Sequence, residues 1–152
     1  GLGDVYKRQV CHLIDGKTGE KLATVSEPSA QRSFGADVLS RIQAAEAGKL
    51  EILKEQIIFQ IAQMLRTLQK KTGRGEQIQR LAVVGNTVMC HLFAGISPVS
   101  IGVTPFMPQE FFGKEYTGEQ LGLTDCRSVY IAPAVAGFVG GDITSDLLAV
   151  MQ

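Results

Sequence analysis

Hydrophobic residues recur at steps of three and four across residues 49–71, and this spacing predicts one long amphipathic helix. Lys70 and Lys71 suit the negative end of the helix dipole, and Gly73 supplies the left-handed residue on which helices often end. We expect the apolar stripe to pack against a sheet. Its members are Leu50, Leu53, Ile57, Ile58, Ile61, Ala62, Met64, Leu65 and Leu68.

The pattern before this helix predicts a β-hairpin. An apolar run at residues 10–14 is followed by turn formers at 15–19 and by alternation from Leu22 to Ser26. The tripeptide at 16–18, Gly-Lys-Thr, invites comparison with a phosphate loop. That motif needs a glycine where Cys11 stands and a helix afterwards, so the hairpin turn is the better interpretation. A short helix is expected to begin near Gly35.

Two strand-turn-helix patterns follow. Residues 81–84 form a run that predicts a strand buried on both faces, followed by a turn at 85–87 and a helix that ends at Gly95. Residues 128–132 predict a second buried strand, and a helix is expected from Ile143 through Val150. Residues 96–127 contain prolines and aromatics without a sustained period, which predicts a long irregular segment. The fold class is therefore α/β, with a mixed sheet and flanking helices.

Candidate chemistry lies where the parallel strands end, because ligands in open α/β sheets bind beyond the carboxyl ends of the strands. The two turns are Gly85-Asn86-Thr87 and Gly140-Gly141-Asp142. Each joins glycine to the start of a helix, where free N–H groups favour anions. Helix capping explains Asn86, Thr87 and Asp142 equally well, since all three residue types are good N-caps. Capping and ligand contact both remain open.

Two further polar features have simpler interpretations. His91 could reach the turn at 85–87, but it is treated as a packed or surface residue outside the core site. Asp37 and Arg41 lie four residues apart on the short helix, where a solvated ion pair is expected.

Composition removes several function classes. Fifteen basic and fifteen acidic residues give zero formal charge among 152 residues, so no electrostatic footprint for nucleic acid or an anionic membrane is present. Cys11, Cys90 and Cys126 lack C-x-x-C pairing and are expected to be buried apolar residues, with no metal site. No apolar run approaches the ~20 residues of a membrane span, and no secretory leader opens the chain. A cytoplasmic protein is expected.

The first residues have an unusual character. Residues 4–9, Asp-Val-Tyr-Lys-Arg-Gln, match the translation of an adapter used to prepare sequencing libraries. We therefore interpret residues 1–9 as an artefact and exclude them from functional reasoning. A genuine polar strand is the alternative. On this interpretation the natural sequence resumes near Val10 and both ends of the chain are artificial.

Four motifs in order resemble the middle region of the reductive activators of corrinoid proteins. They occupy residues 33–42, 83–92, 101–106 and 133–142, and the resemblance covers residues 10–152. It implies an actin-like ATPase fold of the ASKHA type, related to ribonuclease H, of which residues 10–152 form part of the first subdomain. The sheet would then be incomplete.

The resemblance also implies a function. Such activators use ATP hydrolysis, with Mg²⁺, to drive the reduction of Co(II) to Co(I) on a corrinoid protein of a methyltransferase system. The 2Fe-2S cluster would belong to a missing N-terminal domain, and a homodimer is a further expectation. Both phosphate loops would lie outside this chain, so the fragment alone is expected to be inactive.

Residue roles carry over by position. The resemblance implies that Asp142 is catalytic, orienting a water or binding Mg²⁺ through water. Gly85, Asn86 and Thr87 would line the cleft near the γ-phosphate, and Gly140 and Gly141 would also contact the nucleotide. Two alternatives remain: a small-molecule kinase of the same superfamily, and a non-catalytic binding module.

Overall fold

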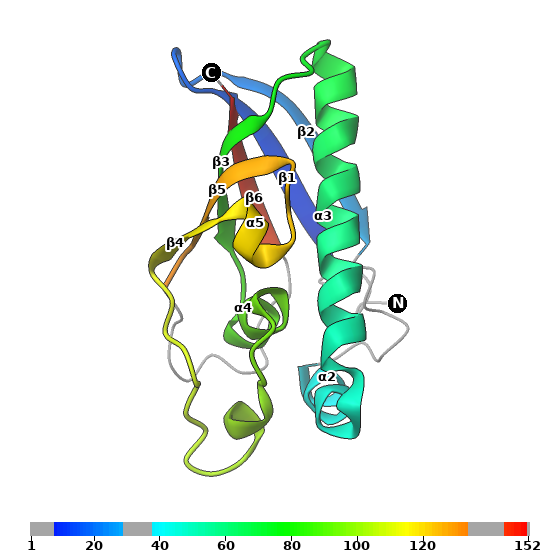
Figure 1. Cartoon of the computed structure of the whole chain (residues 1–152), viewed down its shortest axis with the longest axis vertical. Helices are drawn as coiled ribbons and strands as arrows, with labels where there is room; N and C mark the ends of the chain where they lie inside the picture. Colours follow the sequence, from blue (N-terminus) through cyan, green and yellow to red (C-terminus); the bar gives the residue numbers. More distant parts are fainter. Residues whose placement is uncertain (1–7, 29–37, 134–144, 152) are drawn as a thin grey trace.

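The computed structural model describes residues 8–28, 38–133 and 145–151, in which helices stand beside a mixed sheet (Figure 1). The strands of this part are β1 (Arg8–Asp15), β2 (Lys21–Pro28), β3 (Ile78–Val84), β4 (Lys114–Thr117), β5 (Cys126–Ile131) and β6 (Ser145–Met151). The helical elements are α2 (Val38–Ala44), η2 (Ala45–Lys49), α3 (Leu50–Thr72), α4 (Thr87–Ala94), η3 (Val99–Gly102) and α5 (Gly118–Leu121).

The sheet has six strands in the order β2-β1-β6-β3-β5-β4. Strands β1 and β2 form the predicted antiparallel hairpin at one side. Strands β3 and β5 are parallel neighbours, as expected for two strand-turn-helix units, while β4 closes the other side antiparallel to β5. Both directions of pairing occur, which confirms the mixed α/β sheet.

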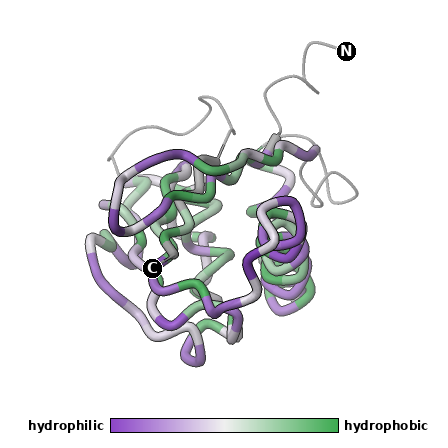
Figure 2. The backbone as a smooth tube through the Cα atoms, turned by 90° about the horizontal axis from the view of Figure 1, so that it is seen from above, coloured by the Kyte–Doolittle hydropathy of each residue, from purple (hydrophilic) through white to green (hydrophobic). Residues whose placement is uncertain are grey.

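The long helix α3 packs against β1, β2 and α4, and Figure 2 shows it standing beside the sheet when viewed from above. Its predicted stripe is largely buried; Leu53, Leu65 and Leu68 are fully enclosed. Each such leucine contributes about 1.5–3 kcal/mol relative to an exposed one. Gly73 ends the helix with φ of 67°, in the left-handed region, as predicted. No helix in the described part is long and apolar enough to cross a membrane.

The hairpin turn accounts for the Gly-Lys-Thr tripeptide without a phosphate. Asp15 Oδ1 accepts hydrogen bonds from the N–H groups of Lys17 (2.8 Å) and Thr18 (3.2 Å). Thr18 Oγ1 in turn accepts from the N–H of Glu20 at 3.2 Å. The turn is closed by its own side chains, so the phosphate-loop interpretation is excluded for this segment.

The predicted C-terminal helix is wrong, because residues 145–151 form strand β6. This strand lies between β1, to which it is parallel, and β3, to which it is antiparallel. A short apolar run is compatible with either a buried helix or a buried strand. Backbone hydrogen bonds to a neighbour on each side favour the strand, and those neighbours are distant in sequence.

Three smaller expectations also need correction. Strand β3 is not buried on both faces in the described part, since Leu81 is enclosed but Val84 is 51% exposed. Residues 96–127 are not wholly irregular, because they contain η3, β4 and α5. Arg41 is fully buried and donates from Nη1 to Met89 Sδ at 3.0 Å, so its side chain is not solvated as expected. Asp37 and Gly35 lie outside the described residues.

Candidate functional site

The turn after β3 is the part of the predicted site that the structure describes. Gly85 and Asn86 connect β3 to α4, and Thr87 is the first residue of that helix. Because β5 runs parallel to β3 and beside it, the carboxyl ends of both strands meet at one edge of the sheet. This edge is where an α/β fold places its ligands.

Asn86 is the N-cap of α4. Its backbone is extended, with φ of −69° and ψ of 163°, and its Oδ1 accepts from the N–H of Met89 at 2.8 Å. Capping is therefore confirmed as one role of this side chain. The Nδ2 atom of the same amide is buried and has no hydrogen-bond partner within the described part of the chain. This unpaired donor at the start of α4 is a candidate contact for a ligand.

The first turn of α4 supplies further donors. The first backbone bond at this end joins the N–H of Cys90 to the carbonyl of Asn86 at 3.1 Å. The N–H groups of Thr87 and Val88 precede it, and the opening N–H groups of a helix lack intrahelical acceptors. An anion at this position would also meet the positive end of the helix dipole. The donor set therefore fits a phosphate oxygen.

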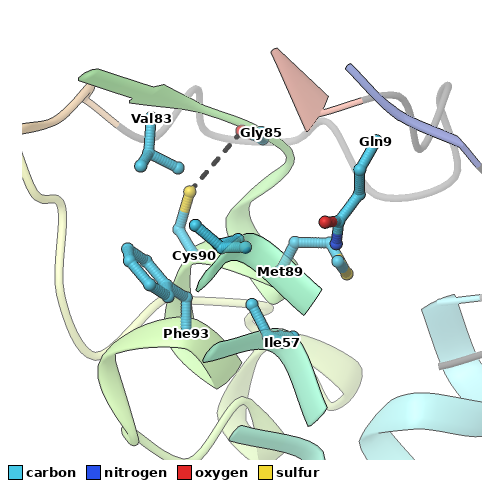
Figure 3. A pocket seen from close by; sticks show the side chains of 8 residues that line it. Gln9, Ile57, Val83, Gly85, Met89, Cys90 and Phe93 are labelled. Carbon is cyan, nitrogen blue, oxygen red and sulfur yellow. Dashed lines mark hydrogen bonds between the residues drawn. The ribbon is translucent and has the colours of Figure 1, made fainter. Parts of the chain in front are cut away.

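The cavity beside the turn is too small for a nucleotide. Its volume is about 20 Å³, enough for roughly one water molecule. Apolar side chains from α3, β3 and α4 line it together with Gly85 and the buried amide of Gln9 (Figure 3). A nucleotide phosphate would have to lie on the outer side of the turn. The predicted residues 85–87 do not line the larger groove of about 500 Å³ between α3 and the segment at 121–125.

The cysteines are buried and free, as predicted. Cys90 Sγ lies 3.7 Å from the Gly85 carbonyl oxygen, to which it donates. Burial raises the pKa of the Cys90 thiol to about 12, and it does the same for Cys11 and Cys126. Since metal and cluster ligands are thiolates, these residues do not fit an iron-sulfur site. In the described ranges no three His, Cys, Asp or Glu side chains are grouped to hold a metal ion.

The second predicted turn, Gly140-Gly141-Asp142, lies outside the described residues. The backbone on its far side is described: β6 begins at Ser145, and Asp146 pairs in register with Val84. Val84 is the residue before Gly85, so the chain returns to the same edge of the sheet just after Asp142. The sequence pattern did not indicate this register, because residues 143–150 were expected to form a helix.

His91 is a packed residue, fully buried on α4, as expected. Its ring contacts both the Thr87 carbonyl, at 2.7 Å from Nδ1, and the segment at 109–110, through Nε2. The helical step of four residues between Thr87 and His91 was visible in the sequence. The second contact was not, because its residues are 18 and 19 positions away.

We expect Asn86→Ala to lower the free energy of unfolding by about 1 kcal/mol, because the cap of α4 is lost. Asn86→Asp should lower it by much less, since a carboxylate caps as well as an amide. Thermal or urea unfolding of the three proteins measures this difference. Equal stability of the alanine and wild-type proteins would contradict the capping role.

Comparison with known proteins gives three concordant similarities. The family model described as the RACo middle region matches residues 7–151. The corrinoid activation enzyme RamQ of Eubacterium limosum is 30% identical over 146 residues, which cover 93% of this chain and 25% of that enzyme. A solved structure, described as a reductive activator for corrinoid, iron-sulfur protein, superimposes with a TM-score of 0.76 at 28% identity.

The structural match covers 88% of this chain and 24% of the reductive activator, so the chain spans about a quarter of the relatives it matches. The match to the family model extends over nearly the whole chain and includes the four motifs and the turn at residues 85–87. This chain belongs to the RACo middle region family, the family of the corrinoid activators.

Proposed function

We propose that this chain is part of an ATP-dependent reductive activator, which uses ATP hydrolysis to drive the reduction of Co(II) to Co(I) on a corrinoid protein. The observation that carries the proposal is the family match over residues 7–151. It is supported by two relatives whose names state corrinoid activation and reductive activation. The actin-like ASKHA fold, the homodimer and the cytoplasmic location belong to the same proposal.

The start of α4 is the part of this chain that suits a phosphate. Phosphate oxygens would accept hydrogen bonds from the N–H groups of Thr87 and Val88 and from Nδ2 of Asn86. Gly85 has no side chain, so a phosphate could approach the backbone closely there. Gly140 and Gly141 would approach the nucleotide from the segment that leads to β6. Positioning and electrostatics account for most of the catalysis of phosphoryl transfer, and these donors supply both.

Asp142 would hold the negative charge that such a site needs. Magnesium supplies charge neutralisation on the transferring phosphoryl group when it is bound. In this proposal the Asp142 carboxylate orients the attacking water or a water on the metal.

The electron-transfer part of the proposal rests on residues beyond this chain. The three cysteines do not fit an iron-sulfur cluster, so a 2Fe-2S centre would be held by another domain of the longer protein. The corrinoid protein is proposed as the electron acceptor. In this proposal the present chain contributes the contacts to the nucleotide, at residues 85–88 and 140–142.

The test uses the complete protein with a corrinoid protein held in the Co(II) state and a chemical reductant. We expect the absorption spectrum of Co(I) to develop when ATP and Mg²⁺ are present and not with ADP. The 152-residue chain alone should give no Co(I), because it spans only about a quarter of the relatives it matches. ATP-dependent phosphorylation of a small molecule without Co(I) formation would instead indicate a kinase. Neither activity would indicate a binding module.

A further inference from the structure

The ring of His91 joins two parts of the chain that are separate in sequence. One is the first turn of α4, at Thr87. The other is the connecting loop, defined here as residues 96–113, which runs from the end of α4 to β4. Both ring nitrogens make a hydrogen bond, and the ring is fully buried. The geometry therefore determines where the ring proton must be.

The hydrogen-bond partners define the tautomer. The carbonyl oxygen of Thr87 can only accept, so Nδ1, at 2.7 Å, carries the proton and donates it. The N–H groups of Gln109 and Glu110 can only donate, at 3.2 and 3.3 Å, so Nε2 must offer its lone pair. The neutral ring with its proton on Nδ1 is the form that satisfies all three partners.

The contact with Phe112 adds to this arrangement. The His91 and Phe112 rings meet edge to face, with centroids 5.2 Å apart and planes at 89°. Phe112 is 7% exposed, whereas Phe106 and Phe111 of the same loop are 54% and 48% exposed. His91 and Phe112 thus anchor the end of a loop whose other aromatic side chains face outward.

We propose that His91 is a positioning residue that holds the connecting loop against the first turn of α4, and that a second proton on its ring releases the loop. A proton on Nε2 would face the N–H groups of Gln109 and Glu110, so two acceptor contacts would be replaced by two donor-donor clashes. The carbonyl contact at Thr87 would survive, so release is confined to the loop. The contact between the loop and α4 therefore becomes sensitive to pH, while helix α4 itself stays folded.

Within the described residues, Glu110 is the charged group that acts on the ring, and it forms an ion pair with Lys114 of β4. Arg41 of α2 reaches α4 at Met89. Burial lowers the pKa of His91 from its ordinary 6.5, while the Thr87 bond and the Glu110 charge act in the opposite direction. The Lys114 hydrogen bond lowers the pKa of Glu110, which favours its charged form.

The sign of the pH effect follows from this shift. The neutral ring is favoured in the folded protein, so its contribution to stability is complete above the pKa of the unfolded state. The contribution is lost as pH falls through the lower pKa of the folded state. Between these two pKa values the released ring binds a proton that the held ring does not, so the closure equilibrium falls by up to about tenfold for each pH unit. Below the lower pKa it no longer changes with pH.

The experiment follows the ring and the loop separately in the 152-residue chain. Nitrogen NMR of the His91 ring reads the tautomer, and hydrogen exchange at the amides of Gln109 and Glu110, corrected for intrinsic rate, reads loop closure. We expect a proton on Nδ1 at about pH 7.5. As the pH falls from the pKa of the released ring to the lower pKa of the held ring, we expect a loss of protection that approaches tenfold per pH unit. The amide of Ala132, which donates to the Val83 carbonyl at 2.9 Å and lies outside the loop, is the internal control.

Variants separate the proton effect from packing. His91→Gln can still donate to Thr87 and accept from the loop but cannot titrate, so its loop protection should not change with pH. His91→Phe should lose that protection at every pH, and Glu110→Gln should keep the pH response. A proton found on Nε2, a ring that stays neutral down to about pH 4.5, or full protection in His91→Phe would overturn the proposal. None of these measurements uses ATP or a corrinoid protein, so their outcome is separate from the proposed function.

Discussion

Replacing Asp142 with asparagine in the complete protein is expected to lower ATP turnover by about 10²-fold or more, because the substitution removes a charge and little else. Asparagine has nearly the size of aspartate and keeps a hydrogen-bond acceptor, so a role that needs no charge predicts almost no loss. Steady-state phosphate release measures the difference. A thermal melt of the same protein shows whether it remains folded.

Asp146 offers a matched control, because its backbone lies in register with Val84 at the same edge of the sheet. We expect Asp146→Asn to retain most of the ATP turnover. If Asp146→Asn loses ATP turnover while Asp142→Asn keeps it, the required charge belongs to Asp146 and our proposal for Asp142 is wrong. Near-normal turnover in a well-folded Asp142→Asn protein would contradict the catalytic role of Asp142.

The Gly118→Ala substitution is expected to destabilise the fold by about 3 kcal/mol or more, at the upper end of the usual overpacking cost. Gly118 begins α5, is buried, and packs against the backbone carbonyl oxygens of Cys126 and Leu123. A Cβ atom at this position would clash with both oxygens, and backbone cannot move aside as a flexible side chain can. Urea unfolding of the chain measures the effect.

Two neighbouring substitutions isolate the cause. Gly122 has φ of 79° and open space around it, so Gly122→Ala should cost only the left-handed strain of about 1–2 kcal/mol. Glu119→Ala changes an exposed side chain of the same helix and should stay within about 0.5 kcal/mol. If Gly118→Ala is no more destabilising than Gly122→Ala, the steric explanation fails.

Local signals in the sequence were sufficient for the hairpin and the two principal helices. The stripe of α3 and the turn chemistry of Asp15 act over a few residues, and the structure confirms both. The same holds for α4, which begins at its Asn86 cap and ends at Gly95 with φ of 75°. Each of these features is determined by neighbours within one or two turns, so no knowledge of the remaining fold was required.

The candidate site was predictable in part for the same reason. The turn at residues 85–87 was predicted from a buried strand, a glycine and a capping residue in succession. The parallel pairing of β3 with β5 places this turn where the carboxyl ends of both strands meet. The amide of Asn86 as a cap was also foreseen. The contacts of His91 with residues 109 and 110 could not be read from the sequence, because no periodic pattern connects α4 to the connecting loop.

By itself, the sequence determined the α/β class, the hairpin, the helices α3 and α4 with their ends, and the family resemblance that the comparisons bear out. The tertiary structure alone decided that residues 145–151 are a strand, that residues 114–117 pair at the edge of the sheet, and that His91 holds the connecting loop. The physical reason is common to all three. Their hydrogen-bond partners lie many residues away, and an apolar or mixed segment without local capping signals adopts the conformation that those distant partners can satisfy.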